Sequence, residues 1–191
     1  GKGSLKELGS KVKAGTAWGV VTSAQSFKNW VASVRGGRGQ HAGDTQGTLV
    51  DVFVAGLESK RTPTAKPANL FEIEQTGNLN FRVYGGGTKI DIDGYSKTTI
   101  LEAKFIDKPG KSPFIEDSSI PPFLRKKIHA EQRNEFERLN AVLKDPKIPF
   151  NHLEVRINDQ AGTPFFQSLI DEFKIPGHVK VVDTKIKKSG N

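Results

Sequence analysis

The stretch Asp91-Ile-Asp-Gly-Tyr-Ser-Lys-Thr-Thr-Ile-Leu-Glu-Ala-Lys104 alternates polar and apolar residues on both sides of an Asp-Gly pair. That pattern predicts two β-strands, one on each side of a bend. Residues two apart in a strand project from the same face, so Glu102 and Lys104 point together. A hairpin between the two strands would bring Asp93 towards Glu102. The stretch therefore predicts two carboxylates and one ammonium group at one edge of a β-sheet.

This group of side chains suits a hard divalent cation. Mg²⁺ is commonly held by one or two carboxylates, with water and substrate phosphate completing the octahedron, and Mn²⁺ accepts the same oxygen donors. Such an ion activates water and neutralises charge on a phosphate, while a lysine beside it stabilises the negative charge of the transition state. Asp93 is the preferred ligand because it adjoins the bend at Gly94, and Asp91, on the same strand face, is the alternative.

A Glu-x-Lys pair also occurs widely as a solvated cross-strand ion pair, which is the structural alternative. Two features favour a catalytic interpretation. The strand that carries Glu102 and Lys104 is otherwise apolar, in the order Thr-Thr-Ile-Leu-Glu-Ala-Lys-Phe-Ile. Charges in apolar surroundings are costly unless they have a partner or a task. The Asp-Gly bend also lies at a suitable distance upstream.

Hydrophobic periodicity on either side of this stretch predicts alternating helices and strands. Helices are expected at residues 24–34, 44–59, 69–77, 123–144 and 163–176. Strands are expected at residues 81–84, 89–93, 98–106, 153–157 and 179–182. From residue 69 onward, the order of helix, three strands, helix, strand, helix and strand predicts an α/β (α+β) fold, in which helices flank a mixed β-sheet.

A proline-bearing polar loop at residues 60–67 is the expected boundary between two parts of the chain. Residues 1–60 then form a helical N-terminal extension, residues 69–185 form the core domain, and residues 186–191 are a basic tail. The length of 191 residues suits one domain with such an appended piece.

Composition narrows the classes of function. The formal net charge of +8 favours polyanionic partners such as nucleic acid. The sequence has no cysteine, which excludes disulfides, thiolate zinc sites and a cysteine nucleophile. The four histidines are scattered and no G-x-S-x-G motif is present, so a histidine-based metal nuclease and a serine hydrolase are disfavoured. No apolar run approaches the roughly 18 residues of a membrane span. We also expect no small-molecule cofactor.

The predicted long helix carries two further candidates. Gln132 stands four residues from Ile128 and four from Phe136, so it interrupts the apolar stripe with a polar group that needs a partner. We expect Gln132 to line the active site and to hydrogen-bond water or substrate; a buried amide that caps a loop is the alternative. Glu135 could join the same edge, although a helix-surface ion pair is the plainer interpretation.

Three basic residues begin this helix. Arg125, Lys126 and Lys127 are candidates for contact with nucleic-acid phosphates. A solvated basic turn is an equally good interpretation of the same residues.

Several short motifs carry a resemblance to a known family. Asp93 followed by Glu102-Ala-Lys104 resembles the D…(D/E)xK signature of the PD-(D/E)xK nuclease superfamily. The resemblance is closest to the restriction-endonuclease-fold toxin domains found at the C-termini of bacterial polymorphic toxins, including Rhs-type and type VI secretion effectors. It covers about residues 69–183, although no proline precedes Asp93 as it does in many relatives. The supporting segments are Phe71-Glu-Ile-Glu-Gln-Thr-Gly77, Ile92-Asp-Gly94, Leu101-Glu-Ala-Lys104 and Ser112-Pro-Phe-Ile115.

The resemblance implies a third acidic ligand on the helix before the first core strand. Glu72 matches that place best, and Glu74 is the alternative. Gln132 followed by Phe136 also resembles the Q-x-x-x-Y feature that follows the Glu-x-Lys strand in some relatives. The expected site is therefore Asp93, Glu102 and Glu72 as metal ligands, completed by Lys104 and Gln132.

The expected activity is hydrolysis of phosphodiester bonds in DNA with Mg²⁺ or Mn²⁺. A ribonuclease with the same site and a non-catalytic nucleic-acid-binding module are the alternatives. The resemblance further implies a toxin that is secreted or delivered by the producing bacterium and acts in the cytoplasm of the target cell. It also implies a cognate immunity protein, which we expect to be acidic because it would cover a basic groove.

Overall fold

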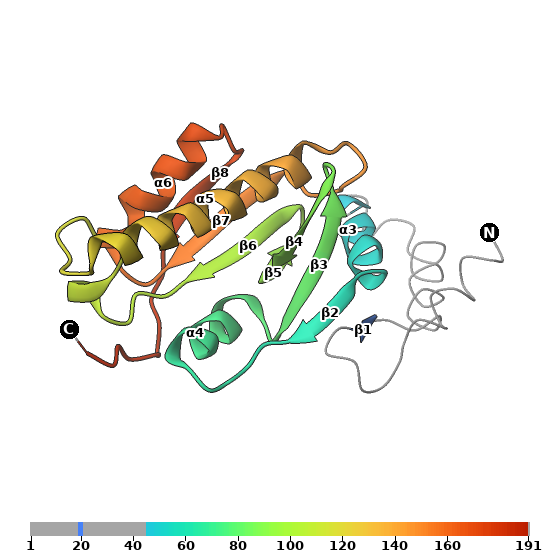
Figure 1. Cartoon of the computed structure of the whole chain (residues 1–191). Helices are drawn as coiled ribbons and strands as arrows, with labels where there is room; N and C mark the ends of the chain where they lie inside the picture. Colours follow the sequence, from blue (N-terminus) through green and yellow to red (C-terminus); the bar gives the residue numbers. More distant parts are fainter. Residues whose placement is uncertain (1–18, 21–44, 191) are drawn as a thin grey trace.

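The computed structural model describes residues 19–20 and 45–190 (Figure 1). Most of the expected N-terminal extension, including the helix expected at residues 24–34, lies outside the described residues. The described part forms two β-sheets covered by helices, and a single hydrophobic cluster joins them. The expected fold class, an α/β fold with helices flanking a mixed sheet, is confirmed.

The first sheet is antiparallel and has the strand order β1-β2-β3-β4. Its strands are β1 (Gly19–Val20), β2 (Glu58–Arg61), β3 (Leu79–Gly85) and β4 (Thr88–Ile92). A tight turn with positive φ at Gly86 and Gly87 joins β3 to β4. Because alternate residues of a strand share a face, Val83, Ile90 and Ile92 point into the core while their neighbours face outward.

The second sheet is mixed and has the strand order β5-β6-β7-β8. Its strands are β5 (Gly94–Ser96), β6 (Thr99–Lys104), β7 (His152–Ile157) and β8 (Gly177–Val181). β5 runs antiparallel to β6, whereas β6, β7 and β8 are parallel. The two sheets meet at Asp93, the one residue that separates β4 from β5.

Helices cover both sides of the strands. Figure 1 shows α5 (Pro122–Lys144) and α6 (Thr163–Glu172) together on one side and α4 (Pro67–Thr76) on the other. Short 3-10 turns at Pro109–Lys111 and Gln160–Gly162 precede α5 and α6. The helices contribute Phe136, Leu139 and Phe166 to the core, where these side chains are fully buried.

The segment before α4 differs from the expectation. The helix expected at residues 44–59 is α3 (Thr45–Ala55), which ends early, and Glu58–Arg61 form β2 instead. β2 pairs with β3 along its whole length. Val50 and Val54 of α3 belong to the main core, and the Tyr95 hydroxyl donates to Asp51 at 2.9 Å. Residues 45–61 are therefore built into the core domain and do not belong to a separate extension.

Gly94 lets β5 and α4 approach each other closely. A Cβ atom at this position would stand 2.5 Å from the carbonyl oxygen of Thr76, the last residue of α4. The backbones can lie this near only because glycine has no side chain. The bend that follows Asp93 is thus packed against the helix that carries Glu72.

Candidate active site

Asp93 stands at the junction of the two sheets and is held there by β6. Its Oδ2 atom accepts a hydrogen bond of 2.8 Å from the backbone N–H of Ala103, the residue between Glu102 and Lys104. This bond closes the hairpin that the sequence predicts. Burial, followed by the nearby charge of Glu72, raises the pKa of Asp93 to about 8.

Glu102 is almost fully buried, with 3% of its surface exposed. Its Oε1 atom is enclosed and has no hydrogen-bond partner among the described residues. Burial, and then the charges of Asp93 and Glu135, raise the pKa of Glu102 well above its ordinary value. A buried oxygen with no partner is costly unless a ligand satisfies it.

Lys104 points into the same space from the end of β6. Its Nζ atom forms an ion pair of 2.8 Å with Oε1 of Glu135 on α5 and lies 5.8 Å from the centre of the Phe166 ring. Burial by itself would lower the pKa of Lys104, but the carboxylates of Glu135, Glu102 and Asp93 raise it above the ordinary value. The side chain therefore remains a cation at neutral pH.

Glu72 reaches the site from α4 and is held by two neutral donors. Its Oε2 atom accepts hydrogen bonds from the Thr62 hydroxyl at 2.8 Å and from Nδ2 of Asn80 at 2.9 Å. Asn80 also donates to the Thr62 hydroxyl at 2.8 Å. Thr62 directly follows β2 and Asn80 lies on β3, and together they fix the direction of the carboxylate.

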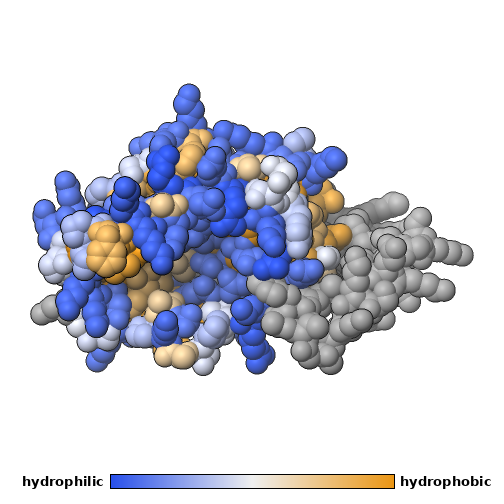
Figure 2. Space-filling view, in the orientation of Figure 1, coloured by the Kyte–Doolittle hydropathy of each residue, from blue (hydrophilic) through white to orange (hydrophobic). Residues whose placement is uncertain are grey.

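These side chains open onto one cavity of about 350 Å³. Its wall comes from six parts of the fold: α4, β3, β4, the bend between β4 and β5, β6, and α5. Hydrophilic side chains gather over the middle of this face of the molecule, between α5 and α4 (Figure 2). The ionisable residues in the wall are Glu72, Asp91, Asp93, Glu102, Lys104, Glu135 and Arg138.

The donors in this cavity suit a hard divalent cation. Asp93 supplies a half-buried carboxylate and Glu102 a buried one, and the Oε1 atom of Glu102 has no hydrogen-bond partner in the described part of the chain. Within residues 19–20 and 45–190 no group of three or more His, Cys, Asp or Glu side chains forms a preassembled metal site. Mg²⁺ needs only one or two carboxylates and takes its remaining ligands from water and substrate. Asp93 and Glu102 would hold such an ion, with Glu72 beside them.

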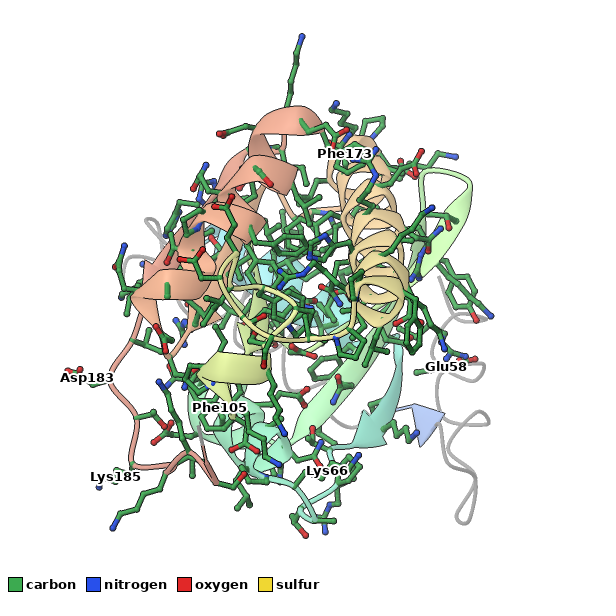
Figure 3. All side chains as sticks on the ribbon, turned by 60° about the vertical axis from the view of Figure 1, so that its left-hand side comes forward. Glu58, Lys66, Phe105, Phe173, Asp183 and Lys185 are labelled. Atoms are coloured by element: carbon green, nitrogen blue, oxygen red, sulfur yellow. The ribbon has the colours of Figure 1, made fainter. Side chains whose placement is uncertain are left out.

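Two alternative carboxylates are placed differently. Glu74 points away from the cavity and accepts hydrogen bonds from the Thr184 hydroxyl and the Lys185 backbone. Figure 3 shows the labelled Asp183 and Lys185 on the C-terminal segment, outside the core. Asp91 lines the cavity but forms a two-pronged ion pair with Arg82, at 2.8 and 3.2 Å. Of these two, only Asp91 is near the site, and its charge is already compensated.

Gln132 lies on α5, about one turn before Glu135. Its Oε1 atom is buried and has no hydrogen-bond partner among the described residues. The described residues that line the cavity include Glu135 but not Gln132. Gln132 is thus one turn of α5 away from a residue of the cavity wall, and its place in the site stays a prediction.

The three basic residues at the start of α5 differ in their contacts and exposure. The guanidinium group of Arg125 donates to the carbonyl oxygens of Pro113, Ile115 and Ser118 and to the Ser118 hydroxyl. Arg125 therefore holds the loop before α5. Lys126 and Lys127 are exposed.

Sequence patterns missed the residues that orient the carboxylates. Thr62 and Asn80 contact Glu72 across ten and eight residues of sequence. Arg138 also lines the cavity, from α5. No local motif marks these residues, because their role follows from the pairing of β2 with β3 and the placement of α4 beside them.

Two sheets that meet at Asp93, with Glu102 and Lys104 on one strand and Glu72 on a flanking helix, form the arrangement that the sequence motifs predict for the restriction-endonuclease fold. The model of one family with this fold, described as restriction endonuclease fold toxin 2, matches residues 67–176, more than half of the chain. The chain belongs to this family, so the resemblance drawn from its motifs is confirmed and a nucleic acid is the expected class of substrate. No curated protein and no solved structure matches the chain significantly.

Proposed function

We propose that this protein is a divalent-metal-dependent deoxyribonuclease and that it acts as a bacterial toxin. The observation that carries the proposal is the pair of carboxylates, half-buried Asp93 and buried Glu102, in one cavity with the Lys104 ammonium group. Such a set has no structural advantage by itself, since buried like charges destabilise a fold. Mg²⁺ or Mn²⁺ bound between them would remove that penalty.

Each side chain then has a distinct task. Asp93 and Glu102 would hold the cation, and Glu72, whose direction is set by Thr62 and Asn80, would be a third carboxylate beside them. The cation supplies charge neutralisation at the scissile phosphate and an activated water nucleophile. Lys104 places a fixed positive charge where negative charge develops on the phosphate.

Glu135 and Gln132 have supporting tasks and do not hold the cation. Glu135 accepts from Lys104 at 2.8 Å and so restricts where the ammonium group can point. Gln132, adjacent on α5, has an unsatisfied oxygen that suits a hydrogen bond with water or substrate. We therefore keep Gln132 as part of the proposed site, in a supporting position.

The test is cleavage of plasmid DNA by the purified chain with Mg²⁺, with Mn²⁺ and with EDTA. We expect cutting with either metal and none with EDTA. Asp93→Ala, Glu102→Ala and Lys104→Ala should each lower the rate by about 10²-fold or more. Glu74→Ala is the matched control, because Glu74 lies on the same helix as Glu72 and points away.

Wild-type rates for all three site variants would refute the site. Metal-dependent cleavage of RNA with intact DNA would replace the deoxyribonuclease with a ribonuclease, because this chemistry does not use the 2′-hydroxyl. Salt-sensitive binding without cleavage would leave a nucleic-acid-binding module.

The toxin role adds a place of action and a partner. We propose that the chain is delivered by the producing bacterium and acts in the cytoplasm of the target cell. Its net charge of +8 suits a cognate immunity protein with an acidic surface. Expression in a bacterial cytoplasm should stop growth, Glu102→Ala should restore it, and co-expression of an acidic protein encoded next to the toxin gene should also restore it. Normal growth with the active enzyme present would contradict the toxin role.

A further inference from the structure

A second cavity adjoins the catalytic one on the side of β2. Its volume is about 200 Å³, and it lies between the end of β2 and the first turn of α4. Glu72, Asn80 and Asp91 belong to the walls of both cavities. The two cavities are therefore neighbours that share three wall residues, and together they are called the groove.

Basic side chains line the second cavity. Lys60 and Arg61, at the end of β2, belong to its wall and are exposed. Lys60 pairs with Asn80 across the sheet and stands two residues before Thr62, so it shares a sheet face with both groups that hold Glu72. The positive end of α4 also faces this space through Asn69.

One of the two acidic groups on this side is paired with a cation, and the other is held by neutral donors. The charge of Asp91 is paired with Arg82 through two hydrogen bonds. Glu72 is engaged by Thr62 and Asn80. The second cavity thus has Lys60 and Arg61 in its wall against one carboxylate without a cationic partner, that of Glu72.

We propose that Lys60 and Arg61 bind the phosphate next to the scissile one, so that the nucleic-acid strand enters the catalytic cavity across β2. The proposal rests on the nuclease function proposed above. A phosphodiester chain carries a charge at every nucleotide, so a strand whose scissile phosphate lies among carboxylates needs cations at the adjacent phosphate. Contacts of this kind fix the position of the backbone without selecting a base sequence.

The assignment of phosphate contacts to Lys60 and Arg61 differs from the one that the sequence favours. Arg125, Lys126 and Lys127 are the candidates by sequence, but Arg125 is committed to loop oxygens. None of these three residues lines either part of the groove. Lys60 and Arg61 escape notice in the sequence because they follow a segment predicted to be helical.

The experiment compares Lys60→Ala/Arg61→Ala with the control Lys126→Ala/Lys127→Ala, which removes the same number of positive charges from α5. Cleavage of a short DNA substrate gives KM and kcat in Mg²⁺ over a range of salt concentrations. Fluorescence anisotropy in EDTA gives binding of the same DNA without cleavage. Thermal unfolding checks that every variant is folded.

We expect the Lys60/Arg61 variant to raise KM about tenfold or more, with kcat close to wild type. The slope of log affinity against log salt should fall by about 2, one for each cation removed from the DNA backbone. Lys60→Arg/Arg61→Lys, which keeps the charge, should restore most of the affinity. The control variant should show a smaller change in both KM and the salt slope.

Wild-type KM and salt slope in the Lys60/Arg61 variant would overturn the proposal, and so would an equal effect in the control. Failure of the proposed nuclease function would give a different result from failure of the Lys60/Arg61 proposal. In that case the wild-type chain does not cut DNA in Mg²⁺, while the anisotropy series still measures the contribution of Lys60 and Arg61 to binding. A wild-type chain that neither binds nor cuts nucleic acid would refute both proposals.

Discussion

At the scale of single residues, Asp93 and Glu102 hold more negative charge in a buried space than the fold can stabilise alone. Burial and the charge of Glu72 raise the pKa of Asp93 from 3.8 to about 8. Between about pH 4 and pH 8 the folded chain therefore keeps a proton that the unfolded chain releases. Stability consequently falls as the pH rises through this window, in the absence of a cation.

Asp93→Asn should remove part of this penalty. In EDTA at pH 8.5 the variant should unfold at a higher temperature than wild type, by roughly 2–4 °C for each kcal/mol of repulsion relieved. The asparagine Oδ1 atom can still accept from Ala103, so the hairpin is kept. Thermal unfolding at pH 6 and pH 8.5 is the measurement, and the difference between the two pH values should shrink in the variant.

Addition of Mg²⁺ should make wild type the more stable of the two proteins. The cation stabilises a folded state to which it binds, and the variant has lost one of the ligands for it. Carboxyl groups with lowered pKa, such as Asp107 and Asp159, do not interfere, since they are ionised at both pH values. Equal stability of the two proteins at pH 8.5 in EDTA would show that the carboxylates do not repel each other.

Glu135→Gln tests how Lys104 is positioned. The amide keeps a hydrogen-bond acceptor for Nζ but removes the charge that anchors the ammonium group at 2.8 Å. We expect kcat to fall by about 10- to 100-fold with little change in KM, as for other groups that orient a catalytic residue. Glu131→Gln, an exposed position one turn earlier on α5, is the control. A change in KM alone would instead make Glu135 a substrate contact.

At the scale of elements, the catalytic cavity depends on the contact between α4 and β5. Gly94 allows that contact, and the helix in turn carries Glu72 into the site. Gly94 also has an ordinary φ, because it is not among the residues with positive values. Glycine is therefore needed at position 94 because a side chain would not fit there, and not because of the backbone conformation.

Gly94→Ala should separate the two elements. The added methyl group would meet the Thr76 backbone, which cannot move without shifting the end of α4. We expect a loss of about 1–3 kcal/mol in the free energy of unfolding. The loss of cleavage rate should be larger than that of a stability-matched variant, because Glu72 moves with the helix.

Denaturant unfolding and single-turnover cleavage are the two measurements for this variant. Ser96→Ala, an exposed position in the same strand, is the control and should leave both quantities unchanged. Full stability and full activity in Gly94→Ala would show that α4 and β5 can separate without cost to the site.

At the scale of the whole molecule, the domain is larger than the segment that the family model matches. That match begins at residue 67, but α3 and β2 precede it and are part of the same fold. Val50 is fully buried in the common core, and Thr62 holds Glu72. The residues before α4 therefore contribute both to stability and to the site.

A chain that begins at Pro67 should fail to fold. It keeps every matched residue but exposes the core surface that α3 covers and the edge of β3 that β2 pairs with. Circular dichroism and denaturant unfolding should show no cooperative transition. In the full chain, Val50→Ala should cost on the order of 2 kcal/mol and leave folding intact. A stable, active chain from Pro67 would restore the boundary expected from the sequence.

The sequence predicts the centre of the site well because its signals are local. Glu102 and Lys104 share a face through the two-residue period of a strand, and the Asp-Gly pair marks the bend that brings Asp93 to them. β2 escapes prediction because Glu58-Ser-Lys-Arg61 has no apolar alternation. Lys60 and Asn80 acquire their places only through strand pairing, which no single segment encodes.

Under the proposed function, the Asp93 junction also decides when cleavage can begin. Asp93 joins the two sheets, Glu102 lies on β6 and Glu72 lies on α4, so neither sheet alone holds a complete set of carboxylates. A copy that is still being synthesised, or is unfolded, is therefore chemically silent. On the proposal of a toxin, folding itself completes the site, and the cell that makes the protein needs protection from that moment and not before.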